Sequence, residues 1–130
     1  MGFKLGPTSD LLLRGVHPDL AKVIRRAAEL SKVEFKVLEG RRSIARQREL
    51  VKKGASKTMK SRHIHGFAVD IAPVVGGVIR WDWPLYYPLA ETVKQAAKDV
   101  GVAVEWGGDW KSFKDGPHWQ LPARKYPDPK

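Results

Sequence analysis

Apolar residues recur at helical spacing in two long stretches of the chain. The first covers residues 18–31, where Pro18 is placed for a first helical turn and the apolar positions are Leu20, Val23, Ile24, Ala27 and Ala28. The second covers residues 85–100 and ends at Gly101; its apolar positions are Leu85, Leu89, Val93, Ala96, Ala97 and Val100. Such stripes predict two amphipathic helices that pack against a core.

A shorter helix is predicted between these two. Ser43 is a suitable N-cap for it, and the helix reaches about Lys53. Ile44, Gln47 and Val51 lie on one stripe of this helix. The polar Gln47 on that stripe is either an ordinary boundary residue or a group turned toward a cleft.

Alternating apolar and polar residues, the pattern of a half-buried strand, mark the segments between the helices. The clearest case is residues 66–72, where three large apolar side chains share one face and Asp70 lies on the other among small residues. Further strands are predicted over residues 33–39, 78–81, 102–106 and 118–121. We therefore expect a single α+β domain over residues 1–130, with a small central antiparallel sheet flanked by helices and an irregular tail at 122–130.

Composition limits the chemistry that the chain can perform. Cysteine is absent from the 130 residues, which excludes disulfides, thiolate metal ligands and a cysteine nucleophile. The hydrophobic content of 42% suffices for the core of one domain without a metal or disulfide staple. The N-terminus lacks the apolar region of a secretory signal, and we expect no transmembrane segment because no apolar run is long enough. Any metal must therefore bind to histidine and carboxylate side chains.

The positive charge is concentrated in the first half of the chain. Residues 1–62 hold 16 Lys and Arg against 6 acids, whereas residues 63–130 hold 8 against 8. Between Arg41 and Arg62 only Glu49 interrupts the basic run. This run is either a solvated face or a surface that attracts polyanions, and no aromatic side chain within it could stack on bases. We expect binding to an anionic cell envelope rather than to nucleic acid.

Histidine and carboxylate side chains suggest a metal site in two alternating segments. Asp70 would be costly to bury without a cation, and His63 precedes it by seven residues. His118 lies on the polar face of the last predicted strand. A lone histidine is more often structural, and spacing alone does not choose between His63 and His65. Two histidines and one aspartate, with a fourth position left to water, are the ligands expected of a catalytic zinc, and Asp115 is well placed as its general base.

Three groups of residues resemble the motifs of one zinc peptidase family. Ser-x-His-x-x-Gly-x-Ala-x-Asp runs from Ser61 to Asp70, Gly40-Arg41-Arg42-Ser43 precedes it, and Trp106-Gly107-Gly108-Asp109-Trp110 and Asp115-x-x-His118 follow it. From Phe3 to about Leu121 the chain is similar to peptidases that cut bacterial cell-wall peptides. The family contains D-Ala-D-Ala carboxypeptidases and dipeptidases and the short phage L-alanyl-D-glutamate endopeptidases, and the chain most resembles the phage endolysins. The resemblance implies a fold similar to the hedgehog signalling domain.

The resemblance also implies roles for single residues. It selects His63 over His65 as the zinc ligand, and Asp115 matches the aspartate that the phage endopeptidases carry at the general-base position. It places Arg42 where a guanidinium could donate hydrogen bonds to a substrate carbonyl and to the oxyanion that forms on it. It also turns Gln47 toward the site.

Further side chains are expected at the cleft. Ser61 could hydrogen-bond a ligand or the substrate, although an ordinary loop serine fits as well. We expect Trp119 inside the core and Trp106 or Trp110 near the cleft, where it would bind substrate. Asp109 and Glu105 remain alternatives to Asp115 as the base.

The expected function follows from these roles. The chain would be a monomeric zinc endolysin that hydrolyses the L-Ala–D-Glu bond of peptidoglycan stem peptides. It would be made without a signal peptide in the cytoplasm of a bacterial host and would act on the cell wall after release. The alternatives are a D-Ala-D-Ala carboxypeptidase or dipeptidase, and a catalytically silent zinc-bearing module that binds cell walls or polyanions.

Overall fold

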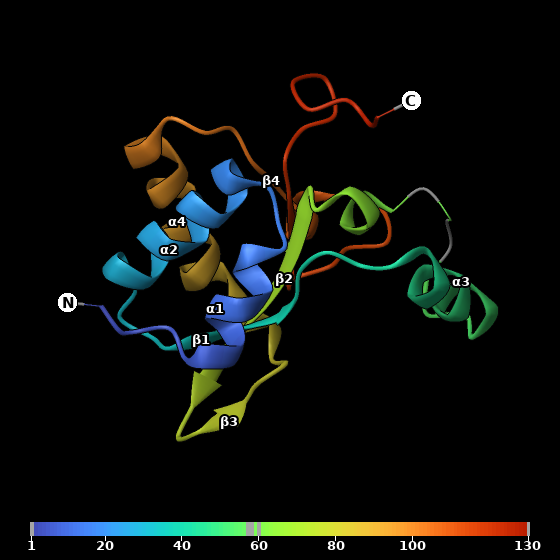
Figure 1. Ribbon diagram of the computed structural model, residues 1–130. Helices are drawn as coiled ribbons and strands as arrows, with labels where there is room; N and C mark the ends of the chain where they lie inside the picture. The colour runs from blue at the N-terminus through green and yellow to red at the C-terminus, as the bar shows by residue number, and fades with distance from the viewer. Residues whose placement is uncertain (1, 57–58, 60, 130) are drawn as a thin grey trace.

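The expected α+β class is confirmed by the computed structural model, which describes residues 2–56, 59 and 61–129 (Figure 1). Its elements, in chain order, are α1 (Pro7–Arg14), α2 (Pro18–Leu30), β1 (Phe35–Glu39), α3 (Ile44–Lys52), the 3-10 helix η1 (Arg62–His65), β2 (Ala68–Val75), β3 (Val78–Ile79), α4 (Trp83–Val100), β4 (Glu105–Trp106), the 3-10 helix η2 (Gly107–Asp109) and β5 (His118–Gln120). No helix among the described residues combines the length and the apolar character needed to cross a membrane.

The sheet is small and antiparallel, as expected, and β2 lies at its centre. Its strand order is β1-β2-β5-β4, and β3 pairs with the far end of β2. The register aligns Ala68 with Gln120 and Asp70 with His118. This register brings two polar side chains, 48 residues apart in sequence, onto adjacent strands.

Two long helices supply most of the core beside the sheet. α2 begins at Pro18, where the Nδ1 atom of His17 accepts a hydrogen bond from the Asp19 amide at 3.0 Å. Its buried face consists of Leu20, Val23, Ile24, Ala27 and Ala28 and packs against α4. Each fully buried aliphatic side chain contributes about 1.5–3 kcal/mol. Gly101, in the left-handed conformation with a φ of 71°, ends α4.

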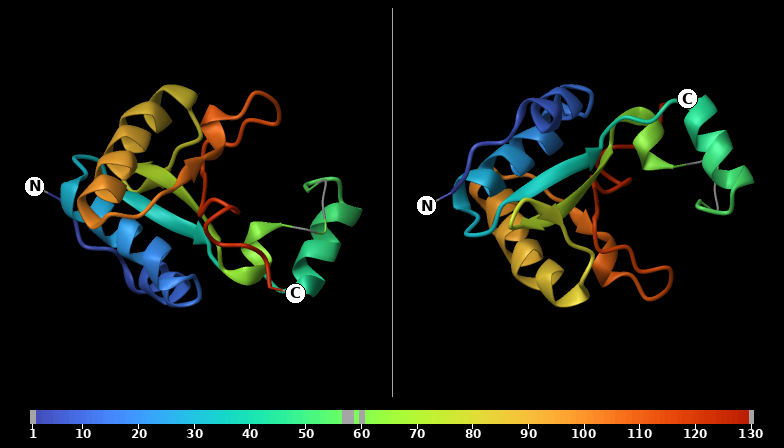
Figure 2. Two further views of the ribbon diagram at one scale, coloured as in Figure 1. Left: turned by 90° about the horizontal axis from the view of Figure 1, so that it is seen from above. Right: turned by 90° about the horizontal axis from the view of Figure 1, so that it is seen from below.

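The short helix α3 stands apart from the other three (Figures 1 and 2). The hydroxyl of Ser43 accepts a hydrogen bond from the Arg46 amide at 3.0 Å, as expected of an N-cap. Gln47 is 0% exposed, whereas Ile44 is 55% exposed, so the predicted apolar stripe is wrong at its first position. The buried side of α3 is therefore built around a polar side chain.

Several boundaries differ from the sequence prediction. β2 continues through Pro73 to Val75 before the chain turns, so the predicted turn at 73–77 shortens to two glycines. α4 begins at Trp83 because a proline at its second position fits a first turn. The strand predicted at 102–106 is reduced to Glu105–Trp106. The polar loop predicted at 54–62 lies partly outside the described residues.

The tail after Leu121 has no helix or strand within the described residues, but side-chain hydrogen bonds hold it to the rest of the domain. The hydroxyl of Tyr126 donates to Asp19 Oδ2 at 2.6 Å, beside the start of α2. Arg62 donates to Asp128 Oδ1 and to the carbonyl of Leu121, both at 2.7 Å. The tail is thus fastened both to α2 and to η1.

Candidate metal centre

Three side chains from separate elements converge at the middle of the sheet. His63 comes from η1, Asp70 from β2 and His118 from β5, and their potential ligand atoms all lie within 4.8 Å of one another. Asp70 Oδ1 is 3.1 Å from His63 Nε2 and 3.1 Å from His118 Nδ1. Both imidazoles are buried. The structure therefore brings together the three ligands that the sequence suggested.

The chain reverses sharply between His63 and Asp70, and Gly66 makes this possible. Gly66 ends η1 with a φ of 75°, and a Cβ atom there would come within 3.0 Å of the Gly15 carbonyl. The segment before β2 was expected to be extended, which would point His65 in the same direction as His63. It is a 3-10 helix instead, and the His65 ring lies against Phe67 at 5.9 Å. The geometry thus separates the two histidines that spacing left equivalent.

Hydrogen bonds behind each imidazole determine its tautomer. His63 Nδ1 donates to the Gly40 carbonyl at 2.8 Å, which leaves the lone pair on Nε2. His118 Nε2 lies 2.8 Å from Gln120 Oε1, and the Gln120 amide nitrogen donates to Glu105 at 3.0 Å. Because the amide oxygen can only accept, His118 Nε2 carries the proton and Nδ1 the lone pair.

In these neutral tautomers, two nitrogen lone pairs and a carboxylate oxygen face one another with no hydrogen between them. The arrangement is favourable only around a positive charge, which could be a metal ion or a proton on one imidazole. Burial alone would raise the pKa of Asp70, but its bonds to His118 and His63 outweigh burial and hold that pKa well below the usual range. Burial lowers the pKa of His118, yet the bond to Asp70 raises it overall. The cluster therefore fits a divalent cation.

Asp115 lies at the edge of the same cleft, which has a volume of about 380 Å³. Its amide donates to the Gly107 carbonyl at 3.1 Å, and a side chain at position 107 would collide with Asp115, so the close approach requires glycine. Burial and the negative charge of Asp70 raise the pKa of Asp115 above the usual value. A carboxyl group with a raised pKa is suited to accept and return a proton.

Arg42 is held in place by partners that the sequence did not reveal. Its guanidinium donates two hydrogen bonds to the two oxygens of Glu39, both at 2.7 Å. A third, at 2.6 Å, goes to Gln47 Oε1, and Gln47 in turn donates to Ser56 at 2.8 Å. Arg42 lines the cleft, whereas the fully buried Gln47 lies behind it and supports it. Gln47 therefore does not reach the cleft surface, contrary to expectation.

Ser61 and the tryptophans also take definite positions. Ser61 lines the cleft, and its hydroxyl accepts from the His63 amide at 3.2 Å, so it caps η1. Trp106, expected to bind substrate, is instead packed in the core, where it stacks on Trp119 at 5.9 Å. Trp110 lines the cleft, and its ring centre is 5.2 Å from that of His118.

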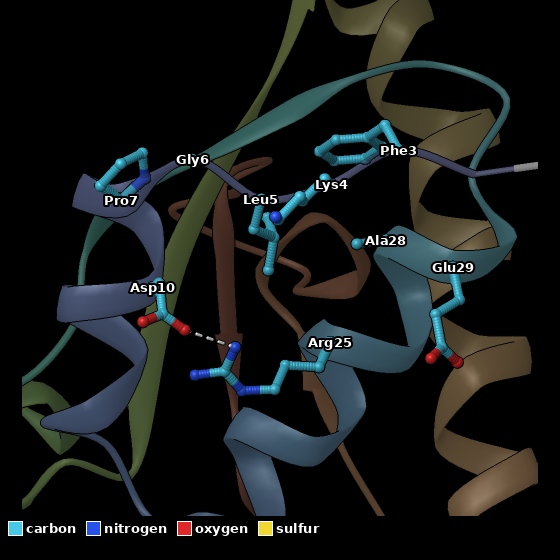
Figure 3. Close-up of a pocket in the computed structure, with 9 residues that line it drawn as sticks. All are labelled: Phe3, Lys4, Leu5, Gly6, Pro7, Asp10, Arg25, Ala28 and Glu29. Carbon is cyan, nitrogen blue, oxygen red and sulfur yellow. Dashed lines mark ion pairs between the residues drawn. The ribbon is translucent and has the colours of Figure 1, made fainter.

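A second hollow, of about 690 Å³, shares no lining residue with this cleft (Figure 3). It is formed by residues 3–7 together with side chains of α1 and α2, among them the ion pair between Arg25 and Asp10 at 2.7 Å. It contains no histidine. Its greater volume therefore does not make it the catalytic site, and the smaller cleft remains the candidate.

Comparisons with known proteins agree with this geometry. The profile of the family described as phage L-alanyl-D-glutamate peptidase matches residues 1–121. The L-alanyl-D-glutamate peptidase of Escherichia phage T5 is 37% identical over 119 residues, which cover 88% of this chain and 87% of that one. The crystal structure of the Serratia marcescens L-Ala D-Glu endopeptidase ChiX matches with a TM-score of 0.91 and 50% identity, over 98% of this chain and 96% of that one.

A more distant structure shares the fold alone. The vancomycin resistance D,D-dipeptidase VanXYg, solved with a D-Ala-D-Ala phosphinate analogue, matches with a TM-score of 0.54 and 19% identity. The match covers 85% of this chain and 53% of that one.

Proposed function

The chain belongs to the phage L-alanyl-D-glutamate peptidase family and is a peptidase of bacterial cell walls, and we propose that it cuts the L-Ala–D-Glu bond of stem peptides at a zinc centre. His63, Asp70 and His118 would hold the zinc ion. The observation that carries this proposal is the convergence of two imidazole lone pairs on Asp70 Oδ1. A nitrogen and oxygen ligand set of this kind, with room for water, suits zinc in a hydrolase.

Zinc bound at this site supplies Lewis acidity, which polarises a peptide carbonyl and makes water more acidic. Asp115 is the general base in our proposal, because it borders the cleft and its pKa is raised by burial and by Asp70. It accepts a proton from the attacking water and returns it to the leaving amine of D-Glu. A raised pKa favours both transfers, because the group can be charged before the first and neutral before the second.

Arg42 stabilises the oxyanion that forms on the scissile carbonyl. Three of its five N–H groups are bonded to Glu39 and Gln47 within the described part of the chain, so two remain for the substrate. The bidentate bond to Glu39 fixes the plane of the guanidinium before substrate binds, which reduces the reorganisation needed in the transition state. Ser61 acts on the site indirectly, because it caps the helix that presents His63.

The part of the basic run that lies on α3, which we call the basic face, would hold the enzyme to the anionic envelope. It consists of Arg46, Arg48, Lys52 and Lys53. Arg46 and Lys53 share the carboxylate of Glu49 at 3.4 and 2.9 Å, whereas Arg48 and Lys52 are exposed and have no acidic partner among the described residues. Unpaired surface cations attract wall polymers and phosphorylated lipids over about one Debye length. We place the action of the enzyme at the wall after its release from the host cytoplasm.

Digestion of purified peptidoglycan tests the bond. The expected products, identified by mass spectrometry of muropeptides, carry a new amino-terminal D-Glu and leave L-Ala on the sugar. Loss of a terminal D-Ala instead would show carboxypeptidase activity and overturn the proposed bond. Metal analysis before and after chelation, with activity restored by added zinc, tests the cofactor. Full activity of the metal-free protein would refute that part of the proposal.

A further inference from the structure

Two aromatic side chains at the start of α4 are exposed beside each other. Trp83 is 39% and Tyr87 55% exposed, and their ring centres lie 6.2 Å apart with an angle of 35° between the ring planes. They are four residues apart on one helix, so both rings lie on the same side of it. Tyr87 also meets the buried Trp106 edge-on at 6.0 Å. This surface, which we call the aromatic pair, is supported from beneath by the core.

The aromatic pair adjoins the wall of the catalytic cleft. Gly116 packs against α4 so closely that a Cβ atom there would come within 3.3 Å of Tyr86 and 3.5 Å of Trp83. The residue before it, Asp115, lines the cleft. Both views in Figure 2 place the beginning of α4 next to the segment between η2 and β5. The segment that contains Asp115 and Gly116 therefore separates the cleft from the start of α4. Asp115 lies on its cleft side, and the aromatic pair lies on its outer side.

The chemistry of peptidoglycan places a sugar close to the bond that is cut. L-Ala is the first residue of the stem and is joined through a lactyl group to the sugar of the glycan strand. If the L-Ala–D-Glu bond lies at the metal centre, that sugar is about two residue lengths away, or roughly 7 Å. D-Glu bears a free carboxylate, which suits the side of the cleft next to α3, where the cation Arg42 lines it. The sugar is then directed to the opposite side, where the aromatic pair lies.

We propose that Trp83 and Tyr87 form a subsite for the sugar that carries the stem peptide, an inference that rests on the proposed function. The apolar face of a pyranose ring stacks on an exposed aromatic ring, which is a neutral, flat partner of similar size. Of the charges near the pair, Arg80 bonds Asp82 at 2.8 Å and Lys94 bonds Asp109 at 2.9 Å. The exposed Glu91, one turn after Tyr87 on α4, adds a negative charge that would repel an anionic polymer. An uncharged sugar thus fits this surface better than a phosphate-bearing polymer.

Kinetics on two matched substrates test the subsite. One is the sugar-free tripeptide L-Ala-γ-D-Glu-diaminopimelate, and the other is the same peptide attached to its N-acetylglucosamine–N-acetylmuramic acid disaccharide. We expect Tyr87→Ala and Trp83→Ala each to lower kcat/KM on the disaccharide peptide about tenfold and to leave the tripeptide within twofold. Tyr87→Phe, which keeps the ring, should match the parent enzyme on both. Leu11→Ala, at a 66% exposed apolar site on α1, is the control for loss of surface apolar area.

Binding of the free disaccharide, followed by tryptophan fluorescence, gives a readout that does not depend on cleavage. We expect saturable binding by the parent protein that Tyr87→Ala abolishes. Equal kinetic losses on both substrates, or unchanged kinetics together with unchanged disaccharide binding, would overturn the subsite. If the parent enzyme cuts neither substrate at this bond yet binds the disaccharide through Tyr87, the proposed bond fails and the subsite stands.

Discussion

Replacing Gln120 with alanine should weaken metal binding without unfolding the protein. Gln120 Oε1 accepts the hydrogen bond from His118 Nε2 at 2.8 Å, and no other partner of Nε2 is present among the described residues. Without that acceptor, His118 loses the bond that fixes its tautomer and orients Nδ1 toward Asp70. Gln120 is partly exposed at the end of β5, so its own contribution to the free energy of unfolding is small, about 1 kcal/mol or less.

The expected magnitude follows from the behaviour of hydrogen bonds behind metal ligands. Loss of such a partner typically reduces metal affinity 10- to 100-fold, which corresponds to about 1.4–2.8 kcal/mol. Glu105→Ala is the matched control. It removes the bond at 3.0 Å that orients the Gln120 amide but leaves the acceptor of His118 in place. We therefore expect the control to lose only a few-fold in affinity.

Zinc affinity is measured by competition with a chromophoric chelator at fixed pH, and unfolding by urea is measured in parallel. The expected order of affinity is parent, then Glu105→Ala, then Gln120→Ala. An affinity of Gln120→Ala within threefold of the parent value would refute the reasoning that this amide sets the ligand geometry. Equal losses in the two variants would instead assign the effect to the Glu105 carboxylate.

Three further predictions concern the base, the support of Arg42 and the basic face. Asp115→Ala should lower kcat about 10²- to 10⁴-fold with unchanged zinc content. In the parent enzyme, kcat should fall as the pH drops through the raised pKa of Asp115, above the usual aspartate range, because the protonated carboxyl cannot accept a proton. Gln47→Ala should reduce the free energy of unfolding in urea by about 2–4 kcal/mol, because it leaves a cavity and removes an acceptor from the buried Arg42. Arg48→Gln combined with Lys52→Gln should weaken binding to cell envelopes, and salt should abolish the difference in a co-sedimentation assay.

Each of these predictions has a control and a contrary outcome. A constant zinc content across the acidic limb shows that metal loss does not cause the fall in kcat, and full wall clearance by Asp115→Ala would remove that residue from the mechanism. Ile44→Ala, on the exposed side of the same helix as Gln47, should change stability by less than about 0.5 kcal/mol. Lys98→Gln on α4 controls for charge, and envelope binding that is indifferent to salt would contradict the role of the basic face.

The periodic parts of the fold could be predicted from the sequence because their cause is local. α2 follows from its apolar stripe, and the alternation around Asp70 predicted that this side chain and the large apolar ones lie on opposite faces of a strand. Two ligands could be proposed for the same reason, since Asp70 and His118 each lie on the polar side of an alternating segment. The metal roles of these residues remain predictions.

What the sequence did not reveal depends on contacts between distant segments. The bond of His63 Nδ1 to the Gly40 carbonyl joins residues 23 apart in sequence, and the bond of Gln120 to Glu105 joins two adjacent strands. The bonds of Glu39 to Arg42 and of Gln120 to His118 are local, and their spacings of three and two residues were usable signals. The 3-10 helix before β2 was missed because its two histidines also fit an extended segment. Its signal was Gly66, a residue able to adopt a positive φ.

The register between β2 and β5 has a consequence for folding. Side chains alternate along a strand, so a slip of one residue would turn Asp70 to the opposite face and leave His118 without it. A refolding chain could therefore capture an ion only after these strands had aligned correctly. Rapid mixing of the refolding chain with zinc and a zinc-sensitive dye would then report when β2 and β5 align. Zinc binding that precedes strand formation would contradict this order of events.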